Sequence, residues 1–157
     1  MLQKSDEAQH VRRDWMQVLA KAPLPMLEGW LRRAGEGGAL PGRAWLRKPE
    51  IGLVMLRGRA GGAGEKFNLG EMTVTRCALR VESGEVGVAY VGGRSQRKAE
   101  LAALADALLQ SAHWRDAVLQ RLVEPARAQI EAQAARDRRK AQATRVEFFA
   151  LAREAGE

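Results

Sequence analysis

Residues 50–110 read EIGLVMLRGRAGGAGEKFNLGEMTVTRCALRVESGEVGVAYVGGRSQRKAELAALADALLQ, and this stretch decides the fold. It holds three short runs of β-branched or long apolar residues, at 53–56, 72–81 and 86–91, each bounded by glycine. Such runs are typical of β-strands. A glycine-rich basic loop separates the first two runs, and Ser83-Gly84 forms a tight turn between the last two. The stretch therefore predicts an antiparallel sheet.

Helices are predicted before and after the sheet. Apolar residues at helical spacing indicate one helix over roughly the first twenty residues and another from Pro25 to Gly35, and we expect these helices to cover one face of the sheet. A third helix follows the last strand, with an apolar stripe that includes Leu101, Leu104 and Leu108. Its opposite side carries alanines, which would let another backbone approach closely.

These elements predict an α+β fold. We expect an antiparallel sheet of about four strands between residues 43 and 91, flanked by N-terminal helices and followed by a long C-terminal helical arm. The first strand covers residues 44–46 and turns at Pro49 and Glu50 into the run at 53–56. The expected domain boundaries are residues 1–123 for the α+β domain and residues 124–157 for the arm.

The run at 72–81 changes its alternation in the middle. Met72 and Val74 share one parity, whereas Cys77, Leu79 and Val81 share the other. The buried face is therefore expected to switch near Arg76, by a bulge or by cover on both faces. Cys77 is expected to be a small buried residue.

The C-terminal arm is predicted as one helix from Ala126 to about Glu154, with Pro125 as its first residue. It has no large apolar residue between Ile130 and Val146, so over that span it has no face to bury against its own domain. We expect a partner-binding cluster at its end, made of Val146, Phe148, Phe149 and Leu151. The alternative is that the helix folds back and this cluster completes the domain's own core.

The charge is concentrated in the strand region. The chain has a formal net charge of +7, and residues 43–98 contribute eleven lysine and arginine residues against five glutamates. A local positive field favours acidic partners, which include small anions, nucleic acid and acidic protein surfaces.

Two sets of residues in this region predict an anion-binding site. Arg57 and Arg59 share a strand face, roughly 6.6 Å apart, and precede a glycine-rich loop whose backbone amides can form an anion-binding nest. Arg94 lies near the start of the helix after the third strand, where an anion would be favoured. The alternatives are a flexible hairpin tip and a solvated basic helix end that Glu100 partly offsets. The complete set of predicted anion-binding residues is Arg57, Arg59, Gly61, Gly62, Gly64, Arg76, Gly93 and Arg94.

Other classes of site lack the necessary residues. A single cysteine excludes an internal disulfide, and two histidines argue against a histidine-based metal site within this chain alone. We expect no catalytic residue and no cofactor in the chain. The first residues lack an apolar leader segment, and no segment reaches the ~18 apolar residues of a membrane helix. The sequence thus predicts a cytoplasmic protein.

Several motifs resemble one known family. They are Gly52-Leu53-Val54, residues 57–64, residues 67–77, Gly93-Arg94, residues 97–100 and residues 144–149, with a looser match around Arg13 and Trp15-Met16. Together they resemble the PhnG family, a subunit of the bacterial carbon-phosphorus lyase system. The sequence departs from the family pattern at Ala63, Gly92 and Ser95.

The resemblance implies a function within a complex. PhnG-like proteins work with PhnH, PhnI and PhnJ subunits, and the family is implicated in replacing the adenine of ATP by a phosphonate. ATP and the phosphonate would then be substrates of the complex, and both are anions. The chain is expected to be a subunit that contributes to a site completed by partners, and a homodimer is a further possibility. Two alternatives stay open: a pure scaffold, and a basic nucleic-acid-binding module, against which the few aromatics of the basic segment argue.

Overall fold

The computed structural model describes residues 2–36 and 40–143. It is an α+β fold, as predicted, with the following elements in chain order: α1 (Leu2–Lys21), α2 (Leu24–Glu36), β1 (Arg43–Arg59), η1 (Ala60–Gly62), β2 (Lys66–Val81), β3 (Val86–Gly92), α3 (Gln96–Gln110), α4 (Arg115–Val118), η2 (Leu119–Val123) and α5 (Glu124–Ala143). The strands form one antiparallel sheet in the order β1-β2-β3.

The sheet of the described residues has three strands, so the expectation of about four was too high. The two strands predicted at 44–46 and 53–56 are parts of the single strand β1. Pro49 lies at a register shift between Arg47 and Glu50, where it has no partner residue in β2. Proline lacks a backbone N–H but is tolerated at bulges and on edge strands, and β1 is an edge strand. The chain therefore continues through Pro49 without turning.

The irregularity expected near Arg76 lies in the neighbouring strand. The pairing of β2 with β3 runs without a shift from Val74 to Arg80. The shift is in the pairing with β1, where Arg47 pairs with Ala78 and Glu50 pairs with Arg76. The extra residues thus belong to β1. Cys77 is fully buried, and burial raises the pKa of its thiol to about 11, as suits a structural cysteine.

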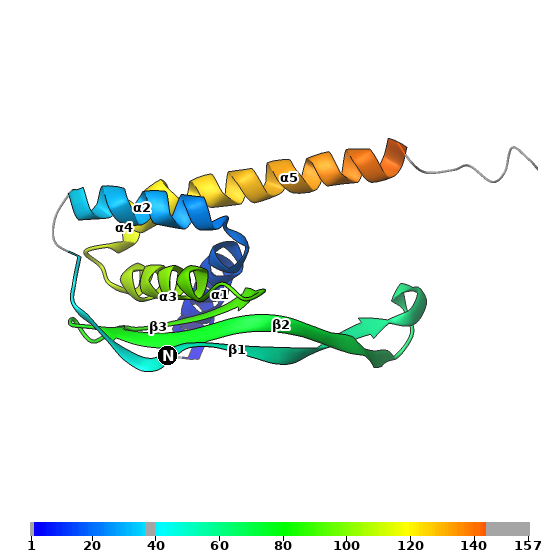
Figure 1. The fold of residues 1–157 in the computed structure, drawn as a ribbon, viewed down its shortest axis with the longest axis horizontal. Helices are drawn as coiled ribbons and strands as arrows, with labels where there is room; N and C mark the ends of the chain where they lie inside the picture. The colour runs from blue at the N-terminus through cyan, green and yellow to red at the C-terminus, as the bar shows by residue number, and fades with distance from the viewer. Residues whose placement is uncertain (1, 37–39, 144–157) are drawn as a thin grey trace, which may run out of the picture.

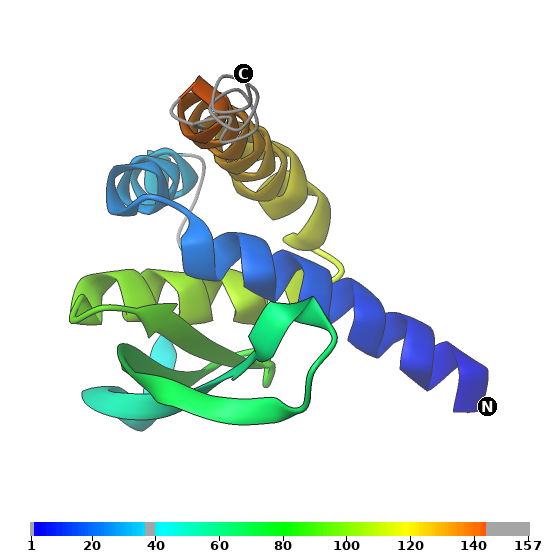
Figure 2. The same cartoon turned by 90° about the vertical axis from the view of Figure 1, so that its right-hand side faces the viewer.

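Three layers make up the folded body (Figure 1). The sheet is the first layer, α3 lies on it with α1 beside α3, and α2 with the start of α5 forms the third (Figures 1 and 2). The residues of α3 from Leu101 to Leu109 are all buried. It is α3 that covers the sheet, so the prediction that both N-terminal helices do so was wrong for α2.

The alanine side of α3 does receive another backbone. A Cβ atom on Gly87 of β3 would collide with the carbonyl oxygen of Ala103 in α3. Only glycine permits this approach, and it seats β3 directly on the helix. The close contact that the alanines predicted is therefore between elements of the same domain.

The helix predicted to begin at Pro125 continues directly from the helical residues before it, and the run contains a π-helical turn. α4, η2 and α5 follow one another directly, so Pro125 lies inside a longer run rather than at its start. The wider π turn just before Pro125 accommodates a residue that has no N–H to donate. Ala126 is buried in the core, whereas residues 131–143 are exposed except for the half-buried Ala135. Over this described span α5 is solvated, as predicted; the cluster Val146, Phe148, Phe149 and Leu151 lies outside the described residues.

β1 and β2 extend well past the rest of the body. β3 pairs only with residues 74–80 of β2, and beyond that point β1 and β2 continue as a two-stranded ribbon (Figure 1). We call residues 51–59 of β1 and 66–73 of β2 the distal ribbon; its first residues, Ile51 and Gly52, lie opposite the last β2 residues that pair with β3. Residues 60–65 are the tip loop, and the tip is this loop together with the flanking Arg57, Arg59 and Lys66. The distal ribbon and α5 project from the body toward the same side (Figure 1).

Candidate functional site

The structure divides the predicted anion-binding residues into two groups. Arg57 and Arg59 stand at the tip of the ribbon, where they pair with Asn68 and Lys66. Arg76 lies eight residues farther along β2 than Asn68, which corresponds to roughly 27 Å at about 3.4 Å per residue. One phosphate group therefore cannot contact both groups, and each has to be considered separately.

The tip is an ordered turn built on Ala60. Its carbonyl oxygen accepts hydrogen bonds from the backbone amides of Ala63 and Gly64, the latter at 3.1 Å. Gly61 takes a left-handed conformation, with φ of 61°, which glycine adopts without strain. The guanidinium of Arg59 donates to the Gly64 carbonyl at 3.0 Å and closes the turn. The Gly64 amide is thus already used, while Gly61 and Gly62 lie in the short helix η1.

Three cations gather at the tip. Arg57, Arg59 and Lys66 are all exposed, and Glu65 is the one acidic residue of the tip loop. Neither the Arg57 side chain nor the Lys66 side chain has a hydrogen bond or ion pair with another residue that the structure describes. Both are therefore free to meet an anion without giving up an existing partner.

Arg76 in the second group is already paired. Its Nε atom donates to Glu50 Oε1 at 2.7 Å, and Arg47 shares the same oxygen at 3.2 Å. The hydrogen bond with Glu50, together with the charge of that carboxylate, holds the pKa of Arg76 above its ordinary value. This exposed cluster carries two arginines against one glutamate, so only part of its positive charge remains for a ligand.

The region before α3 is also largely occupied. The Gly93 amide donates to the Thr73 carbonyl at 2.9 Å, and Thr75 Oγ1 donates to the Gly93 carbonyl at 2.7 Å. Ser95 caps α3 by accepting a hydrogen bond from the Lys98 amide at 3.2 Å. The Gly93 amide predicted to bind an anion therefore has another acceptor in this structure.

Glu100 supplies negative charge near the same helix start. It accepts hydrogen bonds from Arg43 and Arg97, both at 2.8 Å. Burial raises the pKa of Glu100, but the two guanidinium hydrogen bonds outweigh this effect, so the pKa lies below its usual value. The arrangement favours the alternative of a basic helix end offset by Glu100. Arg94 is exposed and has no ion pair within the described part of the chain.

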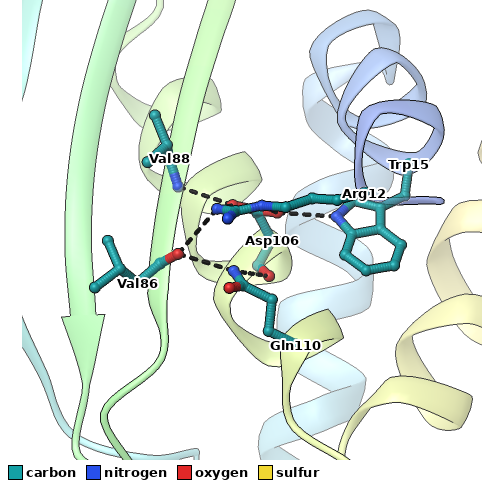
Figure 3. Close-up of polar contacts among 6 residues, drawn as sticks. All are labelled: Arg12, Trp15, Val86, Val88, Asp106 and Gln110. Carbon is teal, nitrogen blue, oxygen red and sulfur yellow. Dashed lines mark hydrogen bonds and ion pairs between the residues drawn. The ribbon is translucent and has the colours of Figure 1, made fainter. Parts of the chain in front are cut away.

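A buried polar cluster was missed in the sequence. Figure 3 shows Asp106 of α3 between α1 and β3. Its carboxylate is fully buried and accepts hydrogen bonds from Arg12 at 2.7 and 3.2 Å, from Trp15 Nε1 at 2.9 Å and from the Val88 amide at 2.9 Å. The signal was an aspartate inside the apolar run LAALADALL. With both oxygens committed, Asp106 joins three elements and is not placed to act as a base.

An open groove lies next to this cluster. It has a volume of about 630 Å³ and is lined mainly by α1 and by the β3 residues 88–91. Arg12 and Arg13 are its charged residues, and no carboxylate lines it. Among the residues that the structure describes, no group of three His, Cys, Asp or Glu side chains could hold a metal ion, and no helix is long and apolar enough to cross a membrane.

The distal ribbon presents a second feature that the sequence reading missed. The sequence predicted strands at 53–56 and 72–81 without assigning the exposure of the first run or of residues 67–69, and Leu53 and Leu69 are 62% and 65% exposed. Exposed side chains of this size lie on both strands: Ile51, Leu53, Met55 and Leu56 on β1, and Phe67, Leu69 and Met72 on β2. Seven of the eleven exposed large apolar side chains in the described part of the chain therefore lie on the distal ribbon, next to the cationic tip.

Comparison with known proteins identifies the family. Residues 10–154 match the family described as "Phosphonate metabolism protein PhnG". The chain belongs to the PhnG family. A relative from Rhizobium meliloti (strain 1021) is 45% identical over 146 residues, which cover 90% of this chain and 88% of the relative. That PhnG protein is named alpha-D-ribose 1-methylphosphonate 5-triphosphate synthase subunit PhnG. The match includes the tip and the ribbon as well as the body.

Proposed function

We propose that the protein is a subunit of an α-D-ribose 1-methylphosphonate 5-triphosphate synthase, the complex that joins a phosphonate to the ribose of ATP and displaces adenine. The observation that carries the proposal is the match to the named Rhizobium subunit over nine-tenths of the chain. In this proposal the chain is inactive alone and contributes to a site that the other subunits complete.

The partners in this proposal are PhnH, PhnI and PhnJ subunits, and the complex works in the cytoplasm. ATP and the phosphonate are substrates of the complex, and no cofactor is held by this chain. The C-terminal cluster Val146, Phe148, Phe149 and Leu151 remains a predicted second contact with these subunits.

The tip of the distal ribbon is the best candidate for a direct contribution to substrate binding. Arg57, Arg59 and Lys66 stand together at the end of a projection, where they reach beyond the chain's own body. Guanidinium groups bind phosphate oxygens through charge-assisted hydrogen bonds. Arg57 and Lys66 have no competing partner among the described residues, which makes this group stronger than the paired Arg76. Arg94 is retained as a separate, single cation.

The test is the steady-state kinetics of the assembled complex. Arg57→Ala with Arg59→Ala should lower kcat/KM by about 10-fold to 100-fold for each charge-assisted bond lost, at roughly 1.5 to 3 kcal/mol each. Arg138→Ala with Arg139→Ala removes the same charge from the exposed part of α5 and is the matched control. Unchanged kinetics in a fully assembled Arg57/Arg59 variant would favour the pure scaffold instead.

A further inference from the structure

The distal ribbon continues the core face of the sheet beyond the helices. Thr75, Cys77 and Leu79 of β2 are buried and alternate along the strand, so they mark the face that α3 covers. Cross-strand partners share a face, and Ile51 pairs with Thr75 while Leu53 pairs with Thr73. Ile51, Leu53 and the next residue of this parity, Met55, therefore lie on the same face, where they are 49%, 62% and 53% exposed. β3 and α3 end before the far end of β1 and β2 (Figure 1).

The opposite face of the distal ribbon is apolar too. Met72 pairs with Val54, and Phe67 pairs with Gly58, which places these side chains on the other face. Leu69 lies over Gly58, since its side chain is the nearest group to a Cβ built there. This face therefore also carries large apolar side chains, and Met72, Phe67 and Leu69 are 41%, 46% and 65% exposed.

Such a ribbon needs cover on both sides. An isolated pair of strands is marginal in water, and a third layer or strand is needed to stabilise it. Soluble monomers rarely expose contiguous apolar patches larger than a few hundred Å². The described part of α5 supplies no cover, because residues 131–143 contain no large apolar side chain.

Charge and geometry together favour a different chain as the cover. Two identical ribbons stacked about a two-fold axis would bury one face of each and leave the other face in water. Two copies would also bring together chains of formal net charge +7. A partner with carboxylates would instead neutralise Arg57, Arg59 and Lys66 around the tip.

We propose that the distal ribbon inserts into an apolar groove of another synthase subunit, which covers both faces of the ribbon and places acidic residues or bound substrate phosphates next to the tip. This inference rests on the proposed function and assigns the main docking surface to residues 51–59 and 66–73. It differs from the C-terminal contact because it requires two opposite faces of one element to be buried at once.

The experiment is co-purification of tagged variants with co-expressed PhnH, PhnI and PhnJ subunits. Leu53→Asp tests the face that continues the core, and Leu69→Asp tests the opposite face. Each should weaken co-purification by about 100-fold, because each buries an unpaired carboxylate at the interface. Val11→Asp is the matched control, since Val11 of α1 is 52% exposed and lies outside the ribbon. It should co-purify like the unchanged protein.

The outcomes separate the alternatives. Failure of the unchanged chain to co-purify would overturn the proposed function, whereas normal co-purification of both ribbon variants would overturn only the docking surface. Weaker co-purification of only one of the two variants would overturn the proposal that the partner covers both faces of the distal ribbon. Thermal unfolding and sedimentation of the isolated chain complete the test: a large loss of stability would show that the chain covers its own ribbon, and dissociation of a dimer would show that a second copy does.

Discussion

Leu79 in β2 is fully buried in the core, whereas Leu69 in the same strand is 65% exposed. Leu79 pairs with Trp45 of β1, whereas Leu69 is the unpaired residue of β2 at the register shift between Leu56 and Arg57. They differ in their surroundings: Leu79 lies on the face that α3 covers, whereas Leu69 lies on the opposite face of the distal ribbon, and β3 and α3 end before the distal ribbon (Figure 1). The part of the strand pair under the helices therefore stabilises the fold, and the distal ribbon is available to a partner.

The largest effect on the covered half is expected from Asp106. Asp106→Ala removes the acceptor of the Arg12, Trp15 and Val88 hydrogen bonds and should cost about 3 to 5 kcal/mol in free energy of unfolding. Denaturant unfolding of the isolated chain measures the loss. Asp106→Asn retains one acceptor oxygen and should lose less. A loss below about 0.5 kcal/mol for Asp106→Ala would contradict the role of this cluster in joining α1, α3 and β3.

The same leucine-to-alanine substitution in the buried and in the exposed part of β2 tests whether the two parts contribute differently to stability. Leu79→Ala should cost about 2 to 5 kcal/mol, since it leaves a cavity in the core. Leu69→Ala should change the stability of the isolated chain by about 0.5 kcal/mol or less, as exposed positions usually do. Equal losses at the two positions would show that something in the chain itself covers Leu69.

A smaller change in stability is expected from the pH dependence of the Glu100 ion pairs. The pKa of Glu100 is depressed in the folded protein, so its interactions with Arg43 and Arg97 stabilise the fold above the unfolded pKa of about 4.3 and are lost as the pH falls through the folded value. Glu100→Gln should therefore lower stability by about 0.5 to 1 kcal/mol near neutral pH, and the difference should vanish in acid. Glu71→Gln on the distal ribbon is the control and should change little at either pH.

The sequence predicted where the helices and strands lie better than it predicted which of their residues are buried. Periodicity located the helices and the apolar runs, and the alanines of α3 predicted the close approach that Gly87 makes. The strand count was too high because Pro49 was interpreted as a turn, although an edge strand with a bulge accepts proline. The exposure of Leu53 and Leu69 was not predictable, since apolar character shows that a residue tends to be buried without showing which chain buries it.

The candidate site was predictable only in part. The cations and glycines of the tip are close in sequence, so their proximity followed from local geometry. Their separation from Arg76 depends on the length of the ribbon, which apolar runs with uncertain ends did not reveal. The ion pair of Arg76 with Glu50 depends on the strand register and on a bulge in β1, and the residues around Arg76 predict neither of them.

The cluster in Figure 3 also determines where the sheet could grow. Arg12 and Gln110 donate to the Val86 carbonyl, and Asp106 accepts from the Val88 amide, so side chains occupy the outward backbone groups at this end of β3. A foreign strand would have to displace a buried carboxylate to pair there. β1 has no strand on its outer side within the described chain. At this end of β3 the edge is therefore closed while the β1 edge is open, so strand addition during assembly or aggregation would proceed from β1.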